Sequence, residues 1–234
     1  MSPCQLSHPP GLPARASKRK RDISVCYIKM TLPYLAFKEC IKATSLRDNC
    51  VARERIEGLV MKASVFVGTS LDGFMARVDG SLDFLPPGGG EPHGYDEFMA
   101  TVDALVIGRN TYEVVLAFDE WPYAQKRVFV LSTRPLAKPP SGAIVEHMEG
   151  SPAQVVSQLE KRGIQHIYVD GGITIQAFLR AGLVQHLTVT RVPVLIGTGI
   201  PLFGATGRDI PLKHIATRQY ASGLVQSEYE VGVS

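Results

Sequence analysis

Apolar segments that predict strands alternate with amphipathic segments that predict helices from residue 61 onward, and this alternation limits the folds open to the chain. The expected strands are short and rich in β-branched residues, and they cover residues 63–68, 104–107, 127–131, 143–146 and 166–169. The expected helices lie at 95–102, from about 110, at 152–162 and from 173 to Gly182. Because strands joined by helices usually run parallel, the pattern predicts an α/β domain.

The end of the chain departs from this alternation. Residues 187–194, 212–220 and 224–231 predict strands with no helix between them, and 221–223 predicts a hairpin turn. We therefore expect a three-layer α/β fold, with a mostly parallel central sheet, helices on both faces and a C-terminal antiparallel hairpin.

Turn and cap residues refine this expectation. Ser151 and Pro152 predict an N-cap and the first helical position of the helix at 152–162. After the first strand, Gly73, Gly80 and residues 86–90 predict a long irregular loop, and long loops inside compact domains usually carry function.

The first sixty residues differ from the rest in charge and in cysteine content. They hold all four cysteines and an excess of basic residues, including the run 18–21, whereas residues 61–234 carry more acidic than basic side chains. We expect a basic, poorly ordered extension at 1–60 and one folded domain at 61–234. The basic run could bind a polyanion or nuclear-import partner, but we favour a solvated tail. Met61 is a candidate start of the domain.

Several functional classes are disfavoured by the composition. The longest uncharged apolar segments fall short of the roughly eighteen residues that a membrane span needs, and no apolar signal segment opens the chain. The mildly acidic domain gives no reason to expect nucleic-acid binding. Without C-x-x-C spacing or clustered histidines, we expect no metal, and we expect a cytoplasmic protein.

Three junctions between a strand and the following segment favour phosphate binding. They are Gly108-Arg109-Asn110-Thr111, Leu131-Ser132-Thr133-Arg134 and Gly171-Gly172-Ile173. Helix N-termini offer free N–H groups and a positive dipole end, and glycine lets a ligand approach the backbone closely. The second junction offers hydroxyls and a guanidinium that suit a 2′-phosphate. Each junction could also be an ordinary turn, but one ligand with separated phosphates would explain all three.

The common nucleotide-binding motifs are absent from the sequence. No G-x-G-x-x-G follows the first strand, and the chain has neither a G-x-x-x-x-G-K-[ST] P-loop nor a G-x-S-x-G elbow. A typical Rossmann domain, a P-loop enzyme and an α/β-hydrolase are therefore disfavoured.

The motifs taken together resemble the dihydrofolate reductase superfamily. The residues that carry the resemblance are Ser70-Leu71-Asp72-Gly73, the segment 103–113 with Gly108-Arg109-Asn110-Thr111, Trp121-Pro122, Leu131-Ser132-Thr133, Gly171-Gly172 and the segment 193–197. Within the superfamily, the chain most resembles the reductase domain of bifunctional riboflavin-biosynthesis proteins, the RibD C-terminal domain, and its stand-alone bacterial relatives. The likeness covers almost all of residues 61–234.

The resemblance implies NADPH as cofactor. It places Gly108 to Thr111 and Gly171 to Ile173 at the pyrophosphate, and Leu131 to Arg134 near the adenosine 2′-phosphate. It implies substrate-side positions at Ser70, Leu71, Asp72, Phe98 and Gly197. Asp72 and Asp96 are the candidate catalytic residues, although Asp72 could equally be a turn-stabilising cap before Gly73.

The function implied is hydride transfer from NADPH to a small pyrimidine- or pterin-like substrate, with 5-amino-6-(5-phosphoribosylamino)uracil reduction as the leading expectation. Alternatives are dihydrofolate reduction and a non-catalytic NADPH-binding module. Folate-reducing members carry a carboxylate one turn before a Phe, and here Gly94 stands one turn before Phe98. By analogy with the same relatives, we expect a homodimer with C₂ symmetry formed through the last strands.

Overall fold

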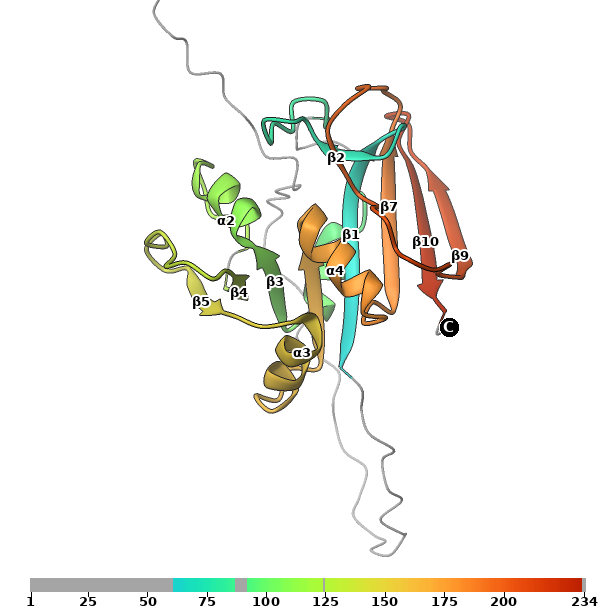
Figure 1. The fold of residues 1–234 in the computed structure, drawn as a ribbon. Coiled ribbons are helices and arrows are strands. Elements are labelled where there is room, and N and C mark those ends of the chain that lie inside the picture. Colours follow the sequence, from blue (N-terminus) through green and yellow to red (C-terminus); the bar gives the residue numbers. More distant parts are fainter. Residues whose placement is uncertain (1–60, 87–91, 124, 233–234) are drawn as a thin grey trace, which may run out of the picture.

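An eight-stranded sheet forms the centre of the computed structural model, which describes residues 61–86, 92–123 and 125–232 (Figure 1). Its strands are β1 (Lys62–Ser70), β3 (Ala104–Gly108), β4 (Arg127–Leu131), β5 (Ile144–Met148), β6 (His166–Asp170), β7 (His186–Val192), β9 (Leu212–Gln219) and β10 (Val225–Val231). The helices are α1 (Tyr95–Thr101), α2 (Arg109–Leu116), α3 (Pro152–Glu160) and α4 (Gly172–Arg180). The expectations for residues 1–60 lie outside the described residues.

The strand order is β5-β4-β3-β6-β1-β7-β10-β9. Every neighbouring pair from β5 to β7 is parallel, whereas β10 is antiparallel to both β7 and β9. The predicted mostly parallel sheet with a C-terminal antiparallel hairpin is confirmed. The amide of Gly223 donates to Tyr220 O within the predicted turn.

Helices cover both faces of the sheet, because the central strands are apolar on both sides. Along β3, Ala104 and Val106 contribute to one buried cluster while Leu105 and Ile107 contribute to the other, and all four are fully buried. The first cluster packs against α3 and α4, which lie in front of the sheet in Figure 1, and the second against α1 and α2. The predicted helices on both faces are thus confirmed.

The ends of the helices on the first face follow the sequence signals. Ser151 caps α3 in a reciprocal capping box with Gln154, and Pro152 occupies its first turn. Gly182, with φ +69°, follows the end of α4, where the amides of Gly182 and Leu183 donate to the carbonyls of Leu179 and Phe178. No helix in the described part of the chain is both long enough and apolar enough to cross a membrane.

A second, two-stranded sheet corrects one expectation. The segment after β1 was predicted to be irregular, but β2 (Phe74–Ala76) pairs antiparallel with β8 (Ile200–Pro201). These strands are too short to show a periodic pattern, and the partner of β2 lies far along the chain.

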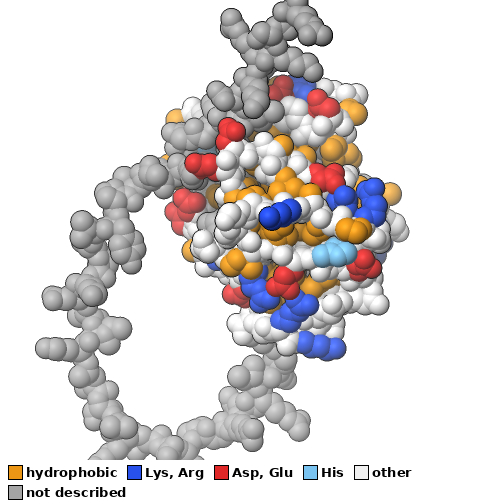
Figure 2. Space-filling model, turned by 90° about the vertical axis from the view of Figure 1, so that its left-hand side faces the viewer, with side chains coloured by type: hydrophobic (Ala, Val, Ile, Leu, Met, Phe, Trp, Pro, Cys, Tyr) orange, Lys and Arg blue, Asp and Glu red, His pale blue; other side chains and the backbone are white. Residues whose placement is uncertain are grey.

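The edge strand β5 is flanked by an ion-pair network. Glu146 accepts from Arg127 and from Arg162 at 2.7 Å each, and the hydrogen bond from Arg127 is the main reason that the pKa of Glu146 lies below its usual value. Figure 2 views the molecule from this side and shows orange apolar side chains surrounded by charges of both signs. Charged groups beside an edge strand oppose pairing with another chain.

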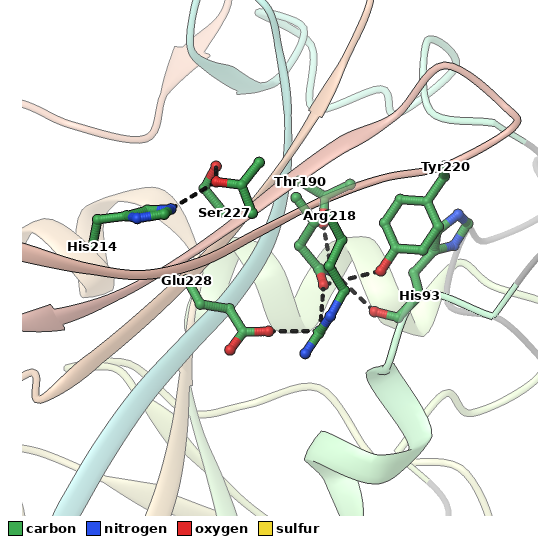
Figure 3. A network of polar contacts seen from close by, with 9 residues as sticks. His93, Thr190, His214, Arg218, Tyr220, Ser227 and Glu228 are labelled. Atoms are coloured by element: carbon green, nitrogen blue, oxygen red, sulfur yellow. Dashed lines mark hydrogen bonds and ion pairs between the residues drawn. The ribbon is translucent and has the colours of Figure 1, made fainter.

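A buried amide joins the C-terminal hairpin to the start of α1 (Figure 3). The side chain of Gln226, 1% exposed, donates to the carbonyl of His93 and to the Thr190 hydroxyl at 2.9 Å each. Its oxygen accepts from the Tyr220 hydroxyl at 3.1 Å. Beside it, Arg218 pairs with Glu228 at 2.6 Å. Because the buried amide of Gln226 is paired at both its nitrogen and its oxygen, this network fixes β9 and β10 against the rest of the sheet.

Candidate functional site

Two helices begin at the same edge of the sheet, where the parallel strands end. Strand β3 leads directly into α2 with Gly108 as the N-cap, and β6 leads into α4 with Gly171 as the N-cap. Neither cap provides a side-chain hydrogen bond to the first-turn amides. Since the first N–H groups of a helix lack partners within it, both ends favour an anion.

The two turns pack against each other through their glycines. A Cβ at Gly108 would lie 2.8 Å from Thr174 Oγ1 on α4, and a Cβ at Gly171 would collide with Thr111 Oγ1 on α2. Gly171 also has φ +94°, a conformation that L side chains rarely adopt. Each glycine therefore leaves room for a threonine of the other helix, which brings the two N-termini together.

A cavity of about 820 Å³ opens in front of these turns. Of the residues predicted to bind cofactor, it brings together Gly108, Arg109, Asn110, Thr111, Leu131, Gly171, Gly172 and Ile173. The cavity wall thus contains two complete predicted junctions, Gly108 to Thr111 and Gly171 to Ile173. From the junction at 131–134 it contains only Leu131, the last residue of β4.

The rest of the second junction, Ser132 to Arg134, is connected to this wall by Arg109. Arg109 Nη1 donates to the carbonyl of Pro135 at 2.7 Å and to Ser132 Oγ at 3.4 Å, and its Nε lies 2.7 Å from a carboxylate oxygen of Glu113. Ser132 to Arg134 do not themselves line the cavity. Arg109 was expected to offer donors to a phosphate, but in the structure its guanidinium joins α2 to the turn after β4.

The mouth of the cavity is apolar and open. Val78 and Ile173, which line it, are 76% and 72% exposed, and Ile200 of β8 is 37% exposed. Met75 and Ala76 of β2 line the same region. Exposed apolar side chains at the rim of a pocket are suited to planar rings.

Asp170, to which the sequence analysis gave no role, is a buried carboxylate in the cavity wall. It ends β6, is 4% exposed and accepts from the amide of Gly171 at 2.7 Å. Burial raises the pKa of Tyr95, and the negative charge of Asp170 raises it further. A carboxylate at a strand end directly before paired glycines is the sequence signal that could have indicated it.

The predicted residues of the loop after β1 lie outside the cavity lining. Asp72 accepts from the amides of Gly197 at 2.7 Å and Ile196 at 3.3 Å, so its carboxylate joins two loops. A hydrogen bond with Ser70 is the largest of the effects that lower the pKa of Asp72. Leu71 is 57% exposed.

The two predicted residues on α1 also lie outside the lining. Phe98 stacks on Phe66 with ring centroids 5.0 Å apart and meets Tyr168 edge to face at 5.1 Å. Asp96 is exposed in the first turn of the helix. The structure therefore places the predicted cofactor residues other than Ser132 to Arg134 around one cavity, and it leaves Asp72, Asp96 and Phe98 outside the lining.

Comparison with known proteins identifies the family that has this architecture. A family model described as the RibD C-terminal domain matches residues 62–226. The chain belongs to the RibD C-terminal domain family. It is 31% identical over 170 residues to the uncharacterized protein YwjB of Bacillus subtilis (strain 168), covering 70% of this chain and 94% of YwjB.

Two further similarities concern proteins whose names state a role. A crystal structure from Shewanella sp. PV-4, of a protein whose name links it to riboflavin biosynthesis, is 36% identical with a TM-score of 0.69 and covers 74% of this chain and 100% of that one. The dihydrofolate reductase HdrB of Haloferax volcanii is 32% identical over 98 residues, 40% of this chain and 50% of HdrB. The resemblance inferred from the motifs is confirmed, and the RibD C-terminal domain family is of the reductase type.

The reciprocal glycine packing of this RibD C-terminal domain predicts a specific loss of stability. Gly171→Ala should lower the free energy of unfolding by about 2 to 4 kcal/mol, because positive φ and the collision with Thr111 both act. Gly142→Ala is the matched control, since Gly142 has φ +83° and open space around its Cβ position, and it should cost only about 1 kcal/mol. Urea unfolding measures both. Equal losses would show that the two turns do not constrain each other.

Proposed function

We propose that the chain is an NADPH-dependent reductase that transfers a hydride to a small pyrimidine- or pterin-like substrate. The first candidate substrate is 5-amino-6-(5-phosphoribosylamino)uracil, and the link to riboflavin biosynthesis in the name of the Shewanella relative supports it. The observation that carries the proposal is the pair of uncapped helix N-termini facing one cavity.

The residues around this cavity fit NADPH. The close approach at Gly108 and Gly171 leaves main-chain amides of α2 and α4 to hold a pyrophosphate, and a side chain at either glycine would strike a threonine of the other helix and push the two helix starts apart. Arg134 is exposed and forms no hydrogen bond or ion pair through its side chain among the described residues. With the hydroxyl of Thr133 beside it, this guanidinium is suited to the adenosine 2′-phosphate.

The apolar rim supplies the remaining contacts. Val78, Ile173 and Ile200 offer surfaces on which planar rings can pack, and a volume of about 820 Å³ accommodates a cofactor of this class. NADPH, when bound, supplies the hydride. The protein must then orient the two reactants and exclude water.

Reduction of a C=N or C=C bond by hydride also needs a proton, and we assign its handling to Asp170. This carboxylate is buried in the cavity wall, whereas Asp72 and Asp96, the carboxylates predicted from the sequence, lie outside the lining. The other carboxylates of the lining, Asp79 and Glu113, are exposed, and they accept from the Ser81 amide and pair with Arg109, respectively. Asp170 is therefore the carboxylate that we assign to bind a ring N–H of the substrate and to hold or move a proton at that position.

Dihydrofolate reduction is the second candidate, favoured by the similarity to HdrB. The start of α1 argues against it, because Gly94 stands where folate-reducing members carry a carboxylate. An assay that offers both an aminopyrimidine ribotide and dihydrofolate therefore distinguishes the two candidate activities.

The activity is tested by following NADPH absorbance with a panel of aminopyrimidine ribotides, pterins and dihydrofolate. We expect turnover of an aminopyrimidine ribotide, and Asp170→Asn should slow it on the order of 100-fold. Asp119→Asn, an exposed position after α2, serves as the charge-matched control. Tight NADPH binding without turnover of any member would instead indicate a non-catalytic binding module.

The choice of cofactor is tested at Arg134. Arg134→Ala should weaken NADPH binding on the order of tenfold and leave NADH binding nearly unchanged, because only NADPH carries the 2′-phosphate. Lys138→Ala, which removes an exposed positive charge from the same connection, should change neither affinity. Equal weakening of both cofactors by Arg134→Ala would refute the assignment.

A C₂ homodimer through the last strands is the assembly that we propose. Strand β9 is an edge strand whose side chains are almost all exposed, including Leu212 at 44% and Ile215 at 46%, and the Gln226 network holds it in place (Figure 3). Sedimentation of the full chain should give a dimer, and Ile215→Arg should shift it toward monomer. A monomeric wild-type protein at micromolar concentration would contradict this assembly.

A further inference from the structure

Two loops that lie far apart in the sequence are joined beside the cavity. The amide of Leu71, after β1, donates to the carbonyl of Val194, after β7, at 2.8 Å. The amide of Leu202 donates to the carbonyl of Gly73 at 3.0 Å, and next to this second contact β2 pairs with β8. We call this two-stranded unit the β2–β8 pair.

The carboxylate of Asp72 makes a further contact between the two loops. Asp72 Oδ2 accepts from the amide of Gly197 at 2.7 Å, and Oδ1 accepts from the amide of Ile196 at 3.3 Å. Both oxygens are therefore engaged by the loop that leads into β8. Hydrogen bonds from N–H groups to an ionised carboxylate are among the stronger ones in proteins.

The β2–β8 pair is seated on the first turn of α4 with little free space. A Cβ at Gly172 would lie 3.1 Å from a methyl carbon of Ile200 and 3.3 Å from the carbonyl oxygen of Pro201. Gln176 Nε2 donates to the same carbonyl at 3.0 Å. Within the pair, a Cβ at Gly199 would collide with the carbonyl oxygen of Ala76.

This seating places part of the pair over the anion site. Met75 and Ala76 of β2 and Ile200 of β8 line the cavity together with Gly171 and Gly172. A shift of the pair would therefore change the space above the α4 N-terminus, because Ile200 and Pro201 lie so near Gly172 that even a single added carbon there would be crowded.

We propose that Asp72 is a positioning residue that holds the β2–β8 pair over the N-terminus of α4 and thereby sets the affinity of the site for its cofactor. The cofactor part of this inference rests on the proposed function. A direct role in proton transfer does not fit Asp72, because it lies outside the cavity lining and both its oxygens accept backbone N–H groups. Its pKa is lowered, chiefly by the hydrogen bond with Ser70, so the group stays ionised at neutral pH.

The test compares Asp72→Asn with the full wild-type chain. Asparagine keeps the size of the side chain but replaces one acceptor oxygen with an NH₂ donor, so it cannot offer a separate oxygen to each of the two amides. Hydrogen exchange should quicken in residues 71–76 and 194–202 and stay unchanged in β3 and β4. The Kd for NADPH and the KM for NADPH should each rise about tenfold, with a much smaller change in kcat.

Two further variants keep the test decisive. Asp209→Asn is the control, because it removes the same charge at an exposed position after β8, and it should match wild type. Gly199→Ala leaves Asp72 intact but forces β8 away from Ala76, so it should reproduce the exchange and affinity changes of Asp72→Asn. This variant decides the question if Asp72→Asn does not fold.

The possible outcomes are distinct. Unchanged hydrogen exchange in Asp72→Asn would refute the claim that Asp72 holds the β2–β8 pair in place. Faster exchange with an unchanged Kd for NADPH would refute the claim that the position of the pair sets cofactor affinity. A loss of kcat alone, with exchange and Kd as in wild type, would make Asp72 a catalytic residue instead. If the wild-type protein failed to bind NADPH, both the proposed function and the proposed effect of Asp72 on cofactor affinity would be refuted. The hydrogen-exchange comparison would still test whether Asp72 holds the β2–β8 pair in place.

Discussion

The mutual packing of two glycine turns is the constraint on which the rest of the site depends. Gly108 accommodates Thr174 and Gly171 accommodates Thr111, so α2 and α4 can begin side by side at the end of neighbouring strands. Neither helix uses a side chain to cap its first amides. Two positive dipole ends are thereby brought to one cavity, where a bound anion would relieve their mutual repulsion.

The surrounding elements adapt this anion site to a larger ligand. Arg109, which lines the cavity, joins α2 to the turn after β4 by donating to the carbonyls of Arg134 and Pro135, while the β2–β8 pair covers the start of α4. Asp170 adds a buried charge where β6 ends. Under the proposed function, phosphate recognition, ring packing and proton handling would come from different elements that meet at one edge of the sheet, as is usual for open α/β sheets.

Local sequence signals predicted most of the fold, because periodicity, the Ser151 cap and the glycines after β3 and β6 act over a few residues. The β2–β8 pair was missed because its strands are short and its register depends on contacts between distant segments. For the same reason, the sequence left open whether Asp72 is catalytic, since its partners are backbone amides of the loop after β7. The orientation of Arg109 was also not predictable, because its acceptors are carbonyls of another turn.

The most direct test of the shared anion site is an NMR titration of the full chain with NADPH, followed through backbone amide shifts. We predict that the largest shifts occur together at residues 109–111 and 172–174, the first turns of α2 and α4, with one common Kd. Saturable binding whose shifts fall elsewhere, or at only one of these two helices, would contradict the account.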